Sequence, residues 1–145
     1  MKKHPDPELV TGLGLAHQLV VREFARRSGV AESRLQLLNL LGGQAEVSQT
    51  EIAERLGADP ASVTRGLQEL ERDGLVSRRA APYDKRVTLV RLSVEGKRAA
   101  EDQQKNLGRF EEELLAGLSK EQIRALQEGL AHLADRARDL RLKEG

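Results

Sequence analysis

Residues 48–92 decide the fold of this chain, and they run SQTEIAERLGADPASVTRGLQELERDGLVSRRAAPYDKRVTLVRL. Ser48, followed three residues later by Glu51, is a capping-box pattern: the hydroxyl accepts the Glu51 backbone N–H while the carboxylate reaches back to the cap. Gly57 supplies the left-handed position that commonly ends a helix. We therefore predict a short helix that begins at Ser48 and ends at Gly57.

A second helix is predicted directly after that turn. Asp59 is a good N-cap, and Pro60 is favoured as the first helical residue because its missing N–H costs nothing there. Val63, Leu67 and Leu70 recur at spacings of four and three, so they share one buried face. The opposite face carries Ala61, Arg65, Gln68 and Arg72, flanked by Ser62 and Thr64.

The exposed face of this second helix has the side chains that suit a DNA major groove. Small residues allow close approach, hydroxyls bond phosphates or bases, and Arg and Gln can bind guanine and adenine through two hydrogen bonds. An ordinary solvated helix face has the same mixed polar composition. The helix taken alone leaves both interpretations open.

A basic β-hairpin is predicted to follow and favours nucleic acid. Gly74 ends the helix, and the β-prone runs Leu75–Arg79 and Val87–Leu92 flank a tip at residues 81–86. From Leu75 to Arg98 the chain has seven Lys or Arg against two acids, a local charge of +5 where the whole protein carries +1. Polyanionic phosphate is the natural partner of such a patch, because each neutralised phosphate releases condensed counterions.

The hairpin also carries a family motif. Asp84-x-Arg86, followed by Val90-x-Leu92-Ser93 and Gly96, resembles the wing signature D-x-R-x-x-x-[LV]-x-L-[TS]-x-x-G of the multiple-antibiotic-resistance regulator (MarR) family. The preceding Leu70, Gly74, Leu75 and Val76 fall where that family has L-x-x-x-G-L-V. Ser93 replaces the commoner Thr, and either hydroxyl can cap the next helix.

This resemblance implies a dimeric transcription regulator that is mainly α-helical, with a small β-hairpin wing. We expect a winged helix-turn-helix over residues 31–104 and a helical dimerisation region over residues 1–30 and 105–145. DNA contacts are expected from Ser48, Pro60, Ala61, Ser62, Thr64, Arg65, Gln68, Arg78, Arg79, Asp84, Lys85, Arg86 and Arg91.

Each part of the predicted interface has its own expected role. The helix over residues 60–73 would enter the major groove, and the hairpin tip would follow the backbone with Arg86 in a minor groove. Asp84 would hold the Arg86 guanidinium in one pose, as the matching pair does in the family. The remaining hairpin cations, Arg78, Arg79, Lys85 and Arg91, would bind phosphates and carry little sequence information.

Both chain ends contribute amphipathic helices. Residues 8–27 form an apolar stripe at helical spacing, whereas residues 31–41 are apolar nearly all round and should be buried. The stretch GKRAAEDQQKN, residues 96–106, is almost entirely polar and is expected to cross solvent between two lobes. The last helix has apolar residues spaced three and four apart, as in a coiled-coil seam. Intramolecular packing could use that seam, but we expect a homodimer formed through Leu9, Leu13, Val20, Ile123, Leu126, Leu130, Leu133 and Leu140.

Composition excludes several classes of function. The chain of 145 residues has no cysteine, so disulfides, cysteine metal sites and thiol-based oxidant sensing are excluded. No stretch is apolar and long enough for a membrane span, and no signal peptide is evident, so a cytoplasmic protein is expected. We predict no enzyme activity, metal or cofactor, because no nucleophile, phosphate-loop or ligand-spacing motif is present. His17 and His132 are expected to be packed or partly exposed residues.

The resemblance also implies regulation. Family members often bind small anionic or phenolic molecules between the dimerisation helices and the winged helix, and by position such a site would use Gln18, Arg22 and Asn39. Solvated surface is the alternative explanation of those three residues. We expect a repressor that binds a pseudo-palindromic operator with half-sites about one helical turn apart. The alternative function is a protein or RNA interaction module, which the +5 hairpin and the few aromatic residues disfavour.

Overall fold

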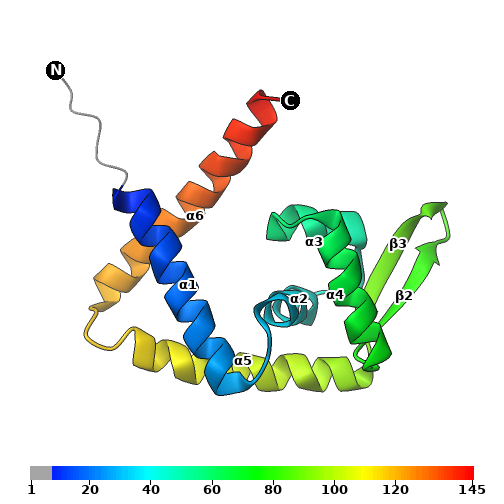
Figure 1. The fold of residues 1–145 in the computed structure, drawn as a ribbon, viewed down its shortest axis with the longest axis horizontal. Coiled ribbons are helices and arrows are strands. Elements are labelled where there is room, and N and C mark those ends of the chain that lie inside the picture. The colour runs from blue at the N-terminus through cyan, green and yellow to red at the C-terminus, as the bar shows by residue number, and fades with distance from the viewer. Residues whose placement is uncertain (1–7) are drawn as a thin grey trace. The chain divides into compact units, whose positions relative to one another are not determined.

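The computed structural model describes residues 8–145 and confirms a mainly α-helical chain with a small antiparallel sheet (Figure 1). The chain divides into two compact units, one ending at Gly108 and the other beginning at Arg109. The elements in order are α1 (Glu8–Ser28), α2 (Glu32–Gly42), β1 (Val47–Ser48), α3 (Gln49–Leu56), α4 (Pro60–Arg72), β2 (Val76–Ala81), β3 (Asp84–Leu92), α5 (Val94–Leu114) and α6 (Lys120–Lys143).

The start of α3 shows half of the predicted capping box. The Ser48 hydroxyl accepts a hydrogen bond from the Glu51 backbone N–H at 3.1 Å. The Glu51 carboxylate does not reach back to the cap as predicted; it accepts from Arg55 Nη2 at 2.8 Å. Ser48 belongs to strand β1 and lies opposite Leu89, so its backbone is part of the sheet. The complete box forms instead at the start of α6, between Ser119 and Gln122.

The turn between α3 and α4 forms as predicted. Gly57 has φ of 58°, the left-handed conformation that glycine adopts without strain. Asp59 caps α4 by accepting the Ser62 backbone N–H at 3.2 Å, and Pro60 is the first helical residue. The two helices are therefore joined by a short, locally determined turn.

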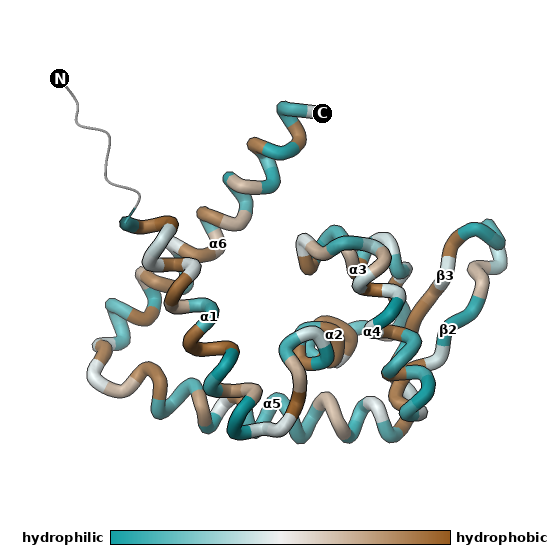
Figure 2. Tube along the Cα trace, in the orientation of Figure 1, coloured by the Kyte–Doolittle hydropathy of each residue, from teal (hydrophilic) through white to brown (hydrophobic). Residues whose placement is uncertain are grey.

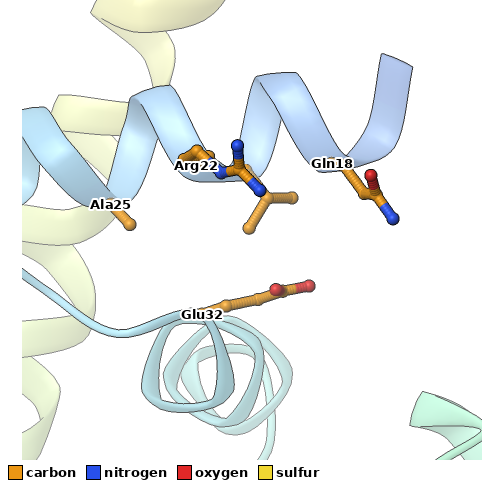
Figure 3. Close-up of a pocket in the computed structure, with 5 residues that line it drawn as sticks. Gln18, Arg22, Ala25 and Glu32 are labelled. Carbon is orange, nitrogen blue, oxygen red and sulfur yellow. The ribbon is translucent and has the colours of Figure 1, made fainter. Parts of the chain in front are cut away.

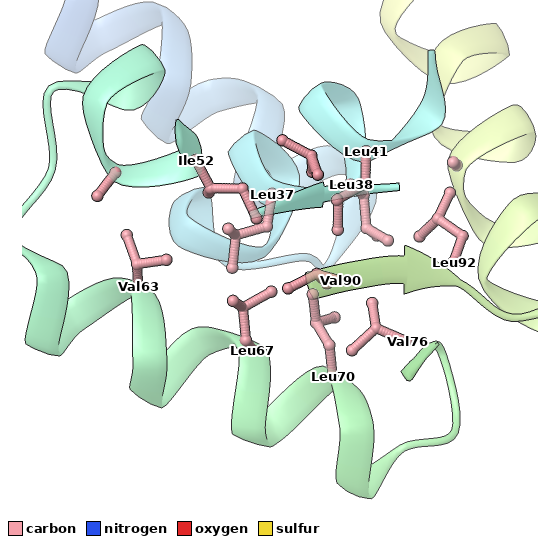
Figure 4. Packing of buried hydrophobic residues seen from close by; sticks show 13 residues of the cluster. Leu37, Leu38, Leu41, Ile52, Val63, Leu67, Leu70, Val76, Val90 and Leu92 are labelled. Carbon is pink, nitrogen blue, oxygen red and sulfur yellow. The ribbon is translucent and has the colours of Figure 1, made fainter. Parts of the chain in front are cut away.

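One side of α4 is buried in the core of the winged helix. Val63, Leu67 and Leu70 project from it toward α2, α3 and β3, and the Leu67 side chain has 0% exposure (Figure 4). Full burial of an aliphatic side chain of this size is worth about 1.5–3 kcal/mol. The packing holds α4 by one face and leaves its opposite face to solvent.

The sheet has strand order β1-β3-β2, with both pairs antiparallel. Its hairpin is longer than predicted: β2 runs to Ala81 and β3 begins at Asp84, so only Pro82 and Tyr83 separate the strands. Lys85 and Arg86 are therefore strand residues, and the predicted six-residue tip is wrong. The pairing continues to Ala81 opposite Asp84 through a register irregularity after Ala80, a local feature with no clear sequence signal.

The polar first half of α5 packs against α2, which corrects the expected passage through solvent. Ala100 is buried, and Gln103 is only 6% exposed. The Gln103 amide donates to the Leu35 carbonyl and to Asn39 Oδ1, each at 2.8 Å. A small residue and a hydrogen-bonded amide can thus form a packed face in a segment whose composition is polar.

The N-terminus of α5 is joined closely to the base of the hairpin. The Ser93 backbone N–H donates to the Leu75 carbonyl at 2.9 Å, and the Ser93 hydroxyl donates to the Gly74 carbonyl while accepting from the Gly96 N–H. A Cβ at position 96 would lie 1.9 Å from the Leu75 carbonyl oxygen, a distance that no side chain tolerates. Glycine is therefore required there by close backbone approach.

Helix α6, in the second unit, has no buried residue. Apolar residues recur along its length (Figure 2), and Leu130 and Leu140 keep 42% and 55% of their surface exposed. In α1, Leu9 and Leu13 are exposed as well. Of the other residues expected at a dimer interface, Val20 and Ile123 are half-buried, and Leu126 and Leu133 are exposed. The described residues, 8–145, contain no helix with the length and apolar character needed to cross a membrane.

Candidate nucleic-acid interface

The exposed face of α4 carries the predicted DNA-contacting residues together. Five of the six, Pro60, Ala61, Ser62, Arg65 and Gln68, are exposed with no bulky apolar neighbour among them. Because Val63, Leu67 and Leu70 fill the core, helical spacing turns Ala61, Arg65 and Gln68 outward, whereas Pro60 is exposed as the first residue of the helix. The sixth, Thr64, is half-buried, and both Ser62 and Thr64 are held by hydrogen bonds.

Ser62 forms part of the helix cap. Its hydroxyl donates to Asp59 Oδ2 at 3.3 Å and accepts from Arg65 Nη2 at 3.2 Å. The Arg65 guanidinium consequently lies toward the N-terminal end of α4 and keeps its other N–H donors. These contacts place a cation beside the small residues at the start of the helix.

Thr64 is connected to the hairpin through Gln49, a residue that the sequence analysis did not single out. Thr64 Oγ1 donates to the Pro60 carbonyl at 3.0 Å and accepts from Gln49 Nε2 at 3.2 Å. Gln49 Oε1 accepts from Arg78 Nη1 at 3.2 Å. Arg78 in turn donates to Glu71 through Nε at 3.3 Å and Nη2 at 3.0 Å. We call Glu71, Arg78, Gln49 and Thr64 the polar relay.

Arg78 and Arg79, which were expected to bind phosphate, each form an ion pair. Consecutive strand residues point to opposite faces, so Arg78 meets Glu71 of α4 while Arg79 meets Glu46. The Arg79–Glu46 contact uses two hydrogen bonds, of 2.9 and 2.8 Å. Hydrogen bonding to the guanidinium lowers the pKa of the carboxyl in each pair, Glu46 and Glu71.

These two pairs change the charge of the hairpin. Glu46 and Glu71 lie outside the segment Leu75–Arg98, and counting them lowers its formal charge by two, from +5 to +3. Among residues 8–145, the predicted cationic contacts that form no ion pair at contact distance are Arg65, Lys85 and Arg91, although Arg91 also helps to lower the pKa of Glu46. Arg91 donates to the Ser77 hydroxyl at 3.3 Å, and Lys85 is exposed.

Near the hairpin turn, Asp84 and Arg86 form the predicted pair. Arg86 donates from Nε and Nη2 to the two Asp84 carboxylate oxygens, each at 3.1 Å, and its backbone N–H donates to Oδ1 at 3.0 Å. The Arg86 side chain is 91% exposed. Its hydrogen bonds lower the pKa of Asp84. The guanidinium is therefore oriented by its neighbour and still projects into solvent.

A pocket of about 350 Å³ lies between α1 and α2. It brings together two of the three predicted effector residues, Gln18 and Arg22, with Val21, Ala25 and Glu32 (Figure 3). The third, Asn39, is not in the lining; its Oδ1 accepts from both Gln103 and Gln104 of α5. Glu32 also lies 3.2 Å from His17 Nε2.

Metal binding finds no support in the side-chain arrangement. His17 is partly exposed beside Glu32, and His132 is exposed on α6. Across the described part of the chain, no three His, Cys, Asp or Glu side chains are grouped so that they could hold a metal ion.

Comparison with known proteins identifies the family. A family model described as the MarR family matches residues 28–87. The chain is 38% identical over 128 residues to YdgJ, an uncharacterized HTH-type transcriptional regulator of Bacillus subtilis (strain 168), covering 88% of this chain and 78% of that protein. It is 36% identical over 80 residues to the HTH-type transcriptional repressor YetL of the same organism, covering 54% of this chain and 48% of YetL.

The fold is likewise shared with solved structures. The crystal structure of a MarR-family transcriptional regulator from Rhodococcus sp. RHA1 superposes with a TM-score of 0.81 at 23% identity, covering 92% of this chain and 96% of that one. The relatives compared are transcriptional regulators and not enzymes. The winged helix that contains α4 therefore has the same fold as those regulators. This chain belongs to the MarR family of transcriptional regulators.

Proposed function

We propose that this regulator binds double-stranded DNA as a homodimer and represses transcription from a pseudo-palindromic operator. The observation that carries the proposal is the outward face of α4, where small, hydroxyl, amide and guanidinium groups lie together on a helix anchored by its other side. MarR-family regulators bind DNA and act as dimers.

In this proposal α4 enters the major groove and the hairpin reaches an adjacent minor groove. Arg65 and Gln68 are long enough to reach base edges, and Ala61 permits close approach. Arg86, held by Asp84, is the side chain that enters the minor groove. Arg78 and Arg79 brace the hairpin through Glu71 and Glu46, so we assign phosphate contacts to Lys85 and Arg91.

The dimer is supported by the apolar residues of the terminal helices. Leucines of α1 and α6 remain exposed in the single chain, and no residue of α6 is fully buried. Large exposed apolar patches mark interaction sites, and exposed leucines that recur along one helix, as in α6, are candidates for such a patch. A two-fold dimer would present two α4 helices to half-sites about one helical turn apart, which is why we expect a pseudo-palindrome.

Repression and its release rest on two further observations. The relative YetL is named a repressor. The pocket is lined by the Arg22 guanidinium, the Glu32 carboxylate and the apolar Val21 and Ala25; Arg22 can bind an anionic or phenolic oxygen, and Glu32 can accept from a phenol hydroxyl. Benzoate and phenol are suitable probes. If the pocket is an effector site, benzoate should weaken operator binding by the wild type, and Arg22→Gln should abolish that effect. Equal benzoate sensitivity of the two proteins would exclude the pocket.

The proposal as a whole is tested by selecting bound duplexes from a random DNA library at about 150 mM salt, where non-specific phosphate binding is already weakened. Recovery of a pseudo-palindrome supports a sequence-specific regulator. Recovery of DNA with no common motif would instead favour the alternative, a winged-helix module that binds protein or RNA.

A further inference from the structure

We infer that Gln49 is a positioning residue for base recognition: the polar relay fixes the Thr64 hydroxyl so that its proton goes to the Pro60 carbonyl, and Thr64 then offers DNA a hydrogen-bond acceptor and a methyl group, but no donor. The inference rests on the proposed function, because it concerns what α4 presents in the major groove. Gln49 itself is half-buried at the first position of α3 and is not placed on the outward face of α4.

The direction of the relay follows from its charged end. A guanidinium has only donors, so the Gln49 atom that meets Arg78 must be the amide oxygen. The two ends of an amide are otherwise hard to distinguish, and this contact removes the ambiguity. The amide nitrogen consequently faces Thr64, 3.2 Å from Oγ1. Since that nitrogen can only donate, the Thr64 hydroxyl must accept.

The hydroxyl proton of Thr64 also has a partner. Oγ1 lies 3.0 Å from the Pro60 carbonyl, one turn back in the same helix, and a carbonyl can only accept. One lone pair therefore takes the Gln49 N–H and the proton goes to Pro60. The hydroxyl keeps one free lone pair, and the side-chain methyl group makes no hydrogen bond.

Base chemistry then limits what Thr64 can recognise. In the major groove the donors are the N6 amino group of adenine and the N4 amino group of cytosine, whereas guanine N7 and O6 are acceptors. A free lone pair accepts from either amino group, and the threonine methyl can contact the thymine methyl. We expect Thr64 to favour an amino or methyl group at its base and to gain no hydrogen bond from guanine.

Arg78 acts on DNA only through this relay. Its side chain is 21% exposed, it is held by two hydrogen bonds to Glu71, and it donates to Gln49 from the face of β2 that looks toward the helices. The relay joins the hairpin, α3 and α4 side chain to side chain. A wing arginine thereby sets the hydrogen-bonding character of a residue on the recognition helix.

The test compares the base preferences of variants at each position of the operator. If Gln49 had only a structural role, its loss would change affinity or stability but not the base preferred at one particular position. Duplexes are selected from the same random library with the wild type, Gln49→Leu, Thr64→Val and the double variant. Thr64→Val keeps the shape and removes the hydroxyl. Gln36→Leu, an exposed glutamine of α2, is the matched control.

The expected result is specific. Wild type recovers a pseudo-palindrome; Gln49→Leu and Thr64→Val lose discrimination at the same base pair of each half-site, by about tenfold. The double variant loses no more than either single variant, because the two residues act as one unit. Gln36→Leu keeps the wild-type motif.

Gln49→Glu provides a second route if Gln49→Leu does not melt cooperatively. It is isosteric and still accepts from Arg78, but its ionised carboxylate has no N–H for Thr64, so it should alter the same base pair. The inference is overturned if the folded Gln49 variants keep the wild-type motif, or if they alter a different base pair from Thr64→Val. A wild type that recovers no motif overturns the proposed function itself and the inference with it.

Discussion

Helices α4 and α6 have the same kind of sequence pattern and very different surroundings. In α4, Val63, Leu67 and Leu70 recur at spacings of four and three and are buried by α2, α3 and β3. In α6, leucines at spacings of three and four remain exposed, and no residue is buried. Periodicity thus indicates that a face must be covered, and only the packing shows whether the same chain covers it. We propose that a second copy covers α6.

The largest expected effect is on the buried side of this comparison. Leu67→Ala removes a side chain with 0% exposure from the centre of the core, so it should lower the free energy of unfolding by about 2–5 kcal/mol. Urea denaturation followed by circular dichroism measures this. Gln68→Ala, the exposed neighbour, should change it by less than about 0.5 kcal/mol. A loss below 1 kcal/mol for Leu67→Ala would contradict the described core.

The second-largest expected effect is on dimerisation through the exposed leucines of α6. Leu130→Glu places a charge among apolar residues that we assign to the dimer interface, and it should weaken dimerisation at least about thirtyfold. Light scattering would then show monomers, and operator affinity would fall with the loss of the second half-site. Gln127→Glu adds the same charge to α6 at an exposed position outside the seam leucines and should remain dimeric. A persistent Leu130→Glu dimer would place the interface elsewhere.

A smaller effect distinguishes the two kinds of wing arginine. Arg86→Ala removes an exposed guanidinium that we place in the minor groove, so it should weaken DNA binding by about 1 kcal/mol or more and reduce the salt slope by about one. Arg79→Ala should reduce that slope less, because Glu46 already neutralises Arg79. Fluorescence anisotropy across a salt series measures both. Unchanged affinity for Arg86→Ala would remove the wing from the interface.

The smallest effect concerns Glu46. Glu46→Gln leaves Arg79 without its carboxylate, so binding to a non-operator duplex should strengthen and its salt slope should steepen by at most about one. Hydrogen bonds from Arg79 lower the pKa of Glu46. The carboxylate is therefore ionised and paired with Arg79 at any pH above the ordinary carboxyl pKa, and the pair is lost only as pH falls through the lowered pKa. The wild-type slope should therefore be the same at pH 8 and pH 6. A steeper wild-type slope at pH 6 would contradict this pairing.

The parts of the fold that depend on neighbouring residues were predictable. The caps at Ser48 and Asp59, the left-handed Gly57 and the buried face of α4 all follow from short-range patterns, and each is present. The Asp84–Arg86 pair is also local, since the two residues are two positions apart, but it was predicted from the resemblance to the family.

Contacts between distant residues were not predictable in the same way. Arg79 meets Glu46 from 33 positions away, and Arg78 meets Gln49 from 29. A count of charges along the hairpin could not include partners that the fold brings in, so it overstated the positive patch. The assignment of residues 1–30 and 105–145 to dimerisation stays a prediction, as do the individual DNA contacts.

The close contact at Gly96 also couples the orientation of α5 to that of the hairpin. Ser93, the residue before the helix, is hydrogen-bonded to Gly74 and Leu75, and Gly96 leaves no space for even a methyl group against Leu75, so the helix and the hairpin base must turn together. At a rise of about 1.5 Å per residue, the segment from Val94 to Gly108 is about 20 Å long. A tilt of a few degrees at the hairpin therefore becomes an ångström-scale displacement at the far end of that segment. By the same geometry, an ångström-scale shift there rotates the DNA-binding elements by a few degrees.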